Sequence, residues 1–142
     1  MSQLGWGLKE MESVCGEFIP CCPSLTRIDM SKTQIGPEGA KHIAKVISVS
    51  ASPTAIDLSW NSIGAEGAKK IAEGIAVSAS LTSINLEANL LGDEGAKHIA
   101  EGIAVSASLT AADLRYNCLD DVAEQGLRDV VKDRASFTLD LR

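Results

Sequence analysis

The chain has 142 residues, enough for one domain with a buried core, and its formal net charge of −6 does not favour nucleic acid or an anionic membrane as a partner. No apolar run approaches the roughly 20 residues of a membrane-spanning helix, and charged residues interrupt the first two dozen positions. We therefore expect an intracellular, cytoplasmic protein that neither inserts into a membrane nor binds nucleic acid.

The cysteines indicate neither a metal site nor a disulfide framework. They are Cys15, Cys21, Cys22 and Cys118, and no two of them have the CxxC spacing of a zinc site. A disulfide framework would require a secreted context, so we expect reduced thiols.

The N-terminal segment, 1–24, is predicted to be a helical cap. Apolar residues lie on one side of a helix spanning about 7–19, and Pro20 and Pro23 end it.

The rest of the sequence repeats every 28 residues. The second and third repeats agree at 19 of 28 positions without a gap, and the segment 137–142 opens a fifth repeat as a final strand. The fourth repeat is more charged and less regular than the others, as terminal repeats are. The predicted repeats are 25–52, 53–80, 81–108 and 109–136.

Each repeat changes its apolar period halfway. The first half alternates apolar and polar residues, as in 81–86, which is typical of a short strand. The second half carries apolar residues at i, i+3, i+4 and i+7, the spacing of one helix face, as in Ala96, Ile99, Ala100 and Ile103.

Stacking of these strand–helix units sets the predicted architecture. One unit cannot bury its own apolar face, but neighbouring units can. Strands pair about 4.8 Å apart, whereas packed helices need about 8–10 Å, so the stack must curve. We predict a single α/β domain over 1–142, a partial horseshoe with a parallel sheet on the concave side and helices on the convex side. The chain is either complete or a fragment of a longer repeat array.

The consensus of the repeats is LxxIxLxxNxIGxEGAxxIAxxI. It resembles the ribonuclease-inhibitor class of leucine-rich repeats, also found in NOD-like receptors and Ran GTPase-activating proteins. The resemblance covers 25–142 and implies a fold rather than one function, because this scaffold binds many partners. It also implies that Asn61, Asn89 and Asn117 end their strands and hydrogen-bond the turning backbone. Thr33 departs from this pattern, so we expect the least regular turn in the first repeat.

No pattern of catalytic residues is present. The sequence contains no GxxxxGK[ST], HExxH or GxSxG motif. His42 and His98 share a position on the outer helices that Lys70 fills in the second repeat, which indicates a solvated surface. We expect no enzyme, no catalytic residue, no cofactor and no metal.

Four rows of side chains are expected on the concave face, one residue from each strand. The rows are Arg27, Ala55, Ser83 and Ala111; Asp29, Asp57, Asn85 and Asp113; Ser31, Ser59, Glu87 and Arg115; and Lys32, Trp60, Ala88 and Tyr116. A row of aspartates could indicate a divalent-cation site. The family that the sequence resembles also carries Asp at this position, however, and Arg27, Lys32 and Arg115 can neutralise the row, so we do not expect a metal. Because the rows hold three bases and four acids, the sequence does not specifically indicate a basic ligand.

Two aromatic residues are the best candidates for a binding site. Trp60 and Tyr116 have no predicted core role, and Trp, Tyr and Arg dominate interface hot spots. The alternative is that Trp60 covers its own sheet against Lys32 and Ala88. The predicted partner-binding residues are Trp60, Tyr116, Arg115, Glu87, Lys32, Asp57 and Asp113.

The leading functional hypothesis is therefore a protein–protein interaction module that binds a partner on its concave face. A first alternative is a structural subunit held in a larger assembly through its ends or outer helices. Self-association through the C-terminal edge strand belongs to this alternative, because 137–142 would leave an open sheet edge. A second alternative, regulation of a small GTPase, rests on the resemblance to Ran GTPase-activating proteins. No loop residue here matches that activity.

Overall fold

The computed structural model describes residues 26–49 and 53–141. The predicted N-terminal helix and three of the four cysteines lie outside this range. Strands and helices alternate through the described residues in the order β1 (Arg27–Asp29), α2 (Gly36–Val49), β2 (Ala55–Asp57), α3 (Gly64–Val77), β3 (Ser83–Asn85), α4 (Gly92–Val105), β4 (Ala111–Asp113), α5 (Asp121–Val131) and β5 (Thr138–Asp140).

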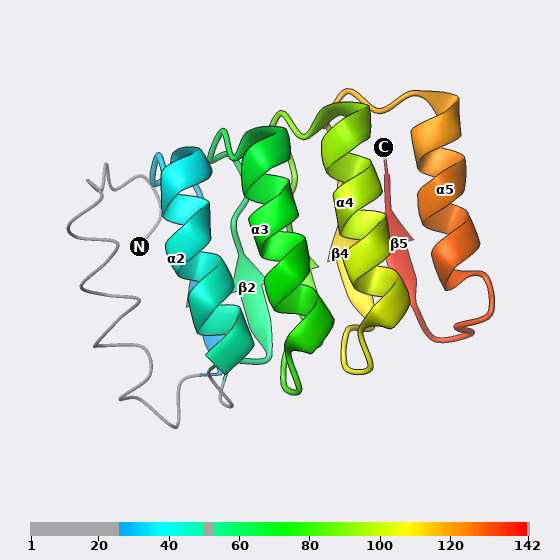
Figure 1. Cartoon of the computed structure of the whole chain (residues 1–142), viewed down its shortest axis with the longest axis horizontal. Helices are drawn as coiled ribbons and strands as arrows, with labels where there is room; N and C mark the ends of the chain where they lie inside the picture. Colours follow the sequence, from blue (N-terminus) through cyan, green and yellow to red (C-terminus); the bar gives the residue numbers. More distant parts are fainter. Residues whose placement is uncertain (1–25, 50–52, 142) are drawn as a thin grey trace.

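The strands form one parallel sheet in chain order, and the helices lie side by side in a single layer on one face of it (Figure 1). From β1 to β4 the register is 28 residues, so that Arg27 pairs with Ala55. The last register is 27 residues, because Ala111 pairs with Thr138. The predicted α/β repeat solenoid is therefore confirmed, and its fourth unit is one residue shorter than the others.

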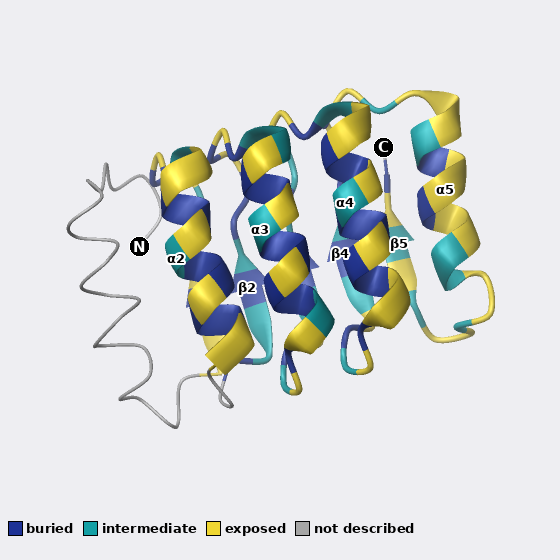
Figure 2. Ribbon diagram, viewed as in Figure 1, coloured by how far each residue is buried: buried dark blue, intermediate teal, exposed yellow. Residues whose placement is uncertain are grey.

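The core lies between the sheet and the helices. The stripe predicted from the i, i+3, i+4 spacing is buried in α2, α3 and α4, where buried and exposed bands alternate along each helix (Figure 2). Ile71, Ile99 and Leu127 occupy the same helix position and are all fully buried. Burial of each such side chain contributes about 1.5–3 kcal/mol, which is why stacked units are stable where one alone is not.

Two glycines allow neighbouring helices to approach closely. A Cβ atom at Gly74 would lie 2.7 Å from the backbone oxygen of Ala44, and one at Gly102 would lie 2.7 Å from that of Ala72. Both distances are too short for van der Waals contact, and a backbone oxygen cannot move aside as a side chain can. Glycine at these positions therefore fixes how closely α2, α3 and α4 pack.

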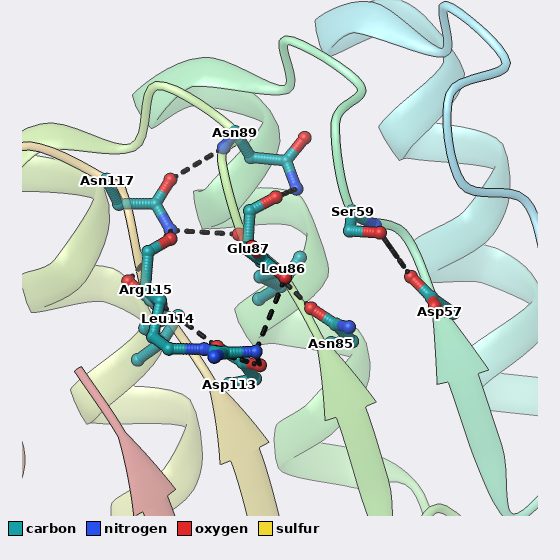
Figure 3. Close-up of polar contacts among 10 residues, drawn as sticks. All are labelled: Asp57, Ser59, Asn85, Leu86, Glu87, Asn89, Asp113, Leu114, Arg115 and Asn117. Atoms are coloured by element: carbon teal, nitrogen blue, oxygen red, sulfur yellow. Dashed lines mark hydrogen bonds and ion pairs between the residues drawn. The ribbon is translucent and has the colours of Figure 1, made fainter. Parts of the chain in front are cut away.

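A ladder of buried asparagines orders the turns between strands and helices. Figure 3 shows its step from Asn89 to Asn117. The Nδ2 of Asn117 donates to the carbonyl groups of Leu86, Leu114 and Arg115, which belong to two successive turns. Asn89 and Asn61 make equivalent bonds one and two repeats earlier, respectively. This is the role that the resemblance implied for the three asparagines.

The expectation that Thr33 makes the first turn the least regular is wrong. Lys32 and Gln34 have positive φ angles of 55° and 59°, close to those of the equivalent residues in the later turns. The Thr33 hydroxyl donates to the carbonyl of Met30 at 2.6 Å, and its backbone N–H donates to Oδ1 of Asn61 at 2.9 Å. The asparagine of the following repeat therefore orders this turn, so an asparagine at Thr33 itself is not needed.

Candidate protein-binding surface

The sheet face opposite the helices is hollowed. A cavity of about 300 Å³ is lined by residues of all five strands, and it contains two of the predicted rows. Along its floor lie the small side chains of Ala55, Ser83 and Ala111. Beside them runs the row of acidic and amide side chains, Asp29, Asp57, Asn85 and Asp113, to which the structure adds Asp140.

The row of acids has a local structural role. Oδ1 of Asp57 accepts hydrogen bonds from the backbone N–H of Ser59 at 2.9 Å and from its hydroxyl at 2.7 Å. Asn85 accepts the equivalent backbone bond from Glu87, also at 2.9 Å. Because an amide makes the same turn as a carboxylate, this turn does not require the negative charge. The negative charge of the aspartates at these positions can therefore act in other interactions, such as ion pairs.

In the first repeat the same turn affects protonation. The hydroxyl and the backbone N–H of Ser31 both donate to Asp29, and they lower the pKa of this carboxyl below its ordinary value. Asp29 is therefore fully ionised at neutral pH.

Arg115 is held by two acids of its own chain (Figure 3). Its Nε lies 3.0 and 3.1 Å from the two carboxylate oxygens of Asp113, and its Nη2 lies 2.8 Å from Oδ2. Nη2 also lies 3.5 Å from a carboxylate oxygen of Glu87. The hydrogen bonds to Asp113 raise the pKa of the guanidinium further above its ordinary value. Three of the predicted site residues thus form one charged cluster, in which Arg115 is already paired.

The two aromatic residues follow the strands that line the hollow, Trp60 three residues after Asp57 and Tyr116 three residues after Asp113. We call the turns that carry them the rim of the hollow. Trp60 is 54% exposed and Tyr116 is 66% exposed, and Nζ of Lys32 lies 6.0 Å from the centroid of the Trp60 ring. Both aromatics have positive φ angles, 60° and 56°, a conformation that bulky L-residues seldom adopt. Trp60 lies beside Lys32, as the alternative interpretation expects, while about half of its side chain stays exposed.

The structure shows several surface features that the residues predicted from the sequence did not include. Asp140 was missed because the last register is one residue short of 28. Leu90 is 65% exposed at the same rim, two positions after Ala88. A row of exposed valines ends the outer helices, at position 25 of three successive repeats: Val49, Val77 and Val105. The sequence could have predicted this row, because the three valines share one repeat position and lie outside the apolar stripe that forms the core.

The histidines lie on the outer helices, whereas the remaining cysteine, Cys118, takes the position in its repeat that Leu90 takes in the third. His42 and His98 are partly exposed on α2 and α4, and Cys118 is an exposed free thiol. Over the described ranges, no three His, Cys, Asp or Glu side chains are grouped so that they could hold a metal ion. No helix in the same ranges is both long and apolar enough to cross a bilayer.

Stacked strand–helix units, one parallel sheet and an asparagine ladder in the turns define a leucine-rich-repeat solenoid. A family model described as "Leucine Rich repeat" matches residues 21–44, 54–72 and 77–100. The chain is a leucine-rich-repeat protein, and its 28-residue units are compatible with the ribonuclease-inhibitor-like class.

Two solved structures have the same fold. Actin-binding site 2 of leiomodin-1 superposes with a TM-score of 0.78 at 16% identity, and the match covers 94% of this chain and 78% of that one. The C-terminal domain of tropomodulin from Caenorhabditis elegans gives 0.76 at 17%, covering 94% and 83%. Identities this low show the shared fold alone. No curated protein sequence matches the chain.

Proposed function

We propose that the protein is a binding module that holds a partner protein on its concave sheet face, with Trp60 and Tyr116 as the main contacts. The observation that carries the proposal is the exposure of these two aromatic side chains, each three residues after an aspartate that lines the hollow. Large aromatics contribute most to binding when a partner removes them from water. At two strand spacings they lie roughly 10 Å apart along the rim, close enough for one partner segment to cover both.

The other predicted residues have supporting roles in this proposal. Lys32 has its Nζ 6.0 Å from the centroid of the Trp60 ring, at the limit of cation–π range. Glu87 and Asp113 hold the Arg115 guanidinium beside Tyr116, so a partner meets a fixed surface there. Asp57 contributes a carboxylate in the hollow. The proposal assigns no catalytic role, and neither His nor Cys is among the residues that line the hollow.

The test removes the aromatic side chains without disturbing their turns. Asparagine favours positive φ, so Trp60→Asn/Tyr116→Asn is expected to keep the backbone as it is. The matched control is Val77→Asn/Val105→Asn, because these valines are similarly exposed, at 65% and 66%, on the outer helices. Each protein is immobilised and used to capture partners from native lysate. Purified actin is the first individual partner to test, since the solved leiomodin structure is described as an actin-binding site.

The proposal predicts a partner that binds the wild type and the valine variant but binds the aromatic variant at least thirtyfold more weakly, about 2 kcal/mol. The opposite pattern, loss in the valine variant alone, would favour the assembly-subunit alternative through the outer helices. Equal binding by all three proteins would exclude both surfaces as the main contact.

A further inference from the structure

The structure changes the charge balance of the concave face. Lys32 lies against Trp60 at the rim and not among the residues that line the hollow. Arg115 is neutralised by its own contacts with Asp113 and Glu87. Asp140 joins the acidic row through the 27-residue register.

The lining is consequently acidic. It contains one base, Arg27, and four acids, Asp29, Asp57, Asp113 and Asp140, a net charge of −3. Arg115, which is not in the lining, neutralises Asp113, so that three acids remain against Arg27, a net charge of −2 in the hollow. No ion pair within 4.0 Å joins Asp29, Asp57 or Asp140 to a basic side chain of the described ranges.

The shape of the hollow suits a chain segment rather than a small ion. The small side chains of Ala55, Ser83 and Ala111 leave a shallow floor that runs across the strands. The acids next to that floor are spread over four strands, about 4.8 Å or more apart, so they do not converge on one point. Apolar floor atoms can contact the methylene stems of Lys and Arg while the carboxylates face their charged ends.

We propose that the partner segment held in this hollow is an extended, basic stretch of protein that lies across strands β1 to β4 with Lys or Arg side chains directed at Asp29 and Asp57. This inference rests on the proposed function and specifies the chemistry of its partner. In an extended segment, alternate side chains point to one face about 6.8 Å apart. Long basic side chains adapt that spacing to the spacing of the strands. Trp60 and Tyr116 at the rim add cation–π contacts to the same segment.

The chain itself supplies a conservative variant for the test. Asn85 makes the same turn as the aspartates and accepts the Glu87 N–H at 2.9 Å. Asp29→Asn/Asp57→Asn is therefore expected to keep both turns and remove two negative charges. The matched control is Glu66→Gln/Glu94→Gln, which removes two negative charges from exposed residues in the first turns of α3 and α4.

The probe is a short fluorescein-labelled peptide of alternating Lys and Ser, with an alternating Glu and Ser peptide as its control. Binding to the full chain is measured by fluorescence anisotropy near physiological salt, where long-range attraction is screened. We expect the lysine peptide to bind about tenfold more weakly to the Asp29/Asp57 variant, and less than about twofold more weakly to the Glu66/Glu94 variant. Arg115→Ala is expected to bind the peptide more tightly, because it removes the positive charge that neutralises Asp113. Amide chemical shifts of the wild type should change along β1 to β4.

Equal weakening by the two double variants, or shifts confined to the helices, would mean non-specific attraction and overturn the inference. Displacement of the peptide by spermine at equal concentration of charge would also overturn it, because a counter-ion would then suffice. The natural partner separates this inference from the proposed function. A partner lost from the aromatic variant but bound fully by Asp29→Asn/Asp57→Asn would uphold the concave face and exclude a basic segment. A partner lost only from the aspartate variant would uphold the basic segment and exclude Trp60 and Tyr116 as the main contacts.

Discussion

The backbone N–H of Asn61 donates a hydrogen bond to Oδ1 of Asn89, which lies 2.9 Å away and one full repeat later in the chain. Asn89 and Asn117 are joined in the same way at 2.8 Å. All three side chains are buried, and in the described part of the chain no buried side-chain nitrogen or oxygen lacks a partner. The turns of the first three repeats are therefore each completed by the asparagine of the next repeat, which couples the repeats to one another.

The asparagine ladder predicts a large cost for Asn89→Ala. The substitution leaves the N–H of Asn61 buried without its acceptor, and it removes one of the two side-chain hydrogen bonds to the carbonyl of Leu58, the other of which comes from Asn61. We expect the free energy of unfolding to fall by about 3 kcal/mol, measured by urea denaturation followed by circular dichroism. Asn89→Asp keeps the acceptor but loses the donor, so it should also be destabilising. An Asn89→Ala protein as stable as the wild type would show that the ladder does not couple the repeats.

The close approach of the helices predicts opposite effects for two Gly→Ala substitutions. At Gly102 the new Cβ would lie 2.7 Å from the backbone oxygen of Ala72, so we expect a loss of about 1–3 kcal/mol. At Gly126, on α5, nothing lies within 4 Å of the new Cβ, and alanine should stabilise the helix by about 0.5–1 kcal/mol. Thermal unfolding of the two variants measures both effects. A stabilised Gly102→Ala protein would contradict the packing described above.

The first acidic turn predicts a pH dependence. Since hydrogen bonds from Ser31 lower the pKa of Asp29 in the folded state, the ionised carboxylate stabilises that state. This contribution is complete above the ordinary pKa near 3.8 and is lost as the pH falls through the lowered value. Ser31→Ala should raise the pKa of Asp29, which carbon-detected NMR titration measures. It should cost at most about 0.5 kcal/mol at neutral pH, because the group is exposed. An unchanged titration of Asp29 in the variant would remove the Ser31 hydroxyl as a cause, since the backbone N–H of residue 31 is still present.

The rim turns predict that Trp60→Asn and Tyr116→Asn fold normally. Both positions have φ near 60°, which asparagine adopts more readily than an aromatic residue. We expect the free energy of unfolding to stay the same or to rise by up to about 0.5 kcal/mol. Chemical denaturation of each variant checks this before any binding assay. A marked loss of stability would instead mean that the aromatic rings support the sheet.

The sequence was sufficient to predict the architecture because the same strand–helix pattern recurs in successive repeats. The change from alternating to helical period located the strands and helices of the first three repeats in the described part of the chain, and the recurrent asparagines located the turns. The first turn was misjudged because its order comes from Asn61, one repeat away, and not from Thr33. A hydrogen bond between two repeats becomes visible only in the structure, where the repeats are stacked.

The candidate site was less predictable because it depends on which charges pair. Sequence rows placed Arg115, Glu87 and Asp113 on one face, but they do not reveal that a single guanidinium contacts both acids. Counting residues in steps of 28 also left Asp140 out of the acidic row. A basic partner segment was not indicated until these two facts altered the balance of charge in the hollow.

The central claim, that a partner covers the concave face, is tested most directly by photo-crosslinking. A photoreactive phenylalanine analogue replaces Trp60 or Tyr116 in one set of proteins and Val77 or Val105 in another, and each is irradiated with native lysate. The account predicts that one partner is crosslinked from the two rim positions and from neither helix position. Crosslinking of the partner from Val77 and Val105, with none from Trp60 and Tyr116, would contradict it.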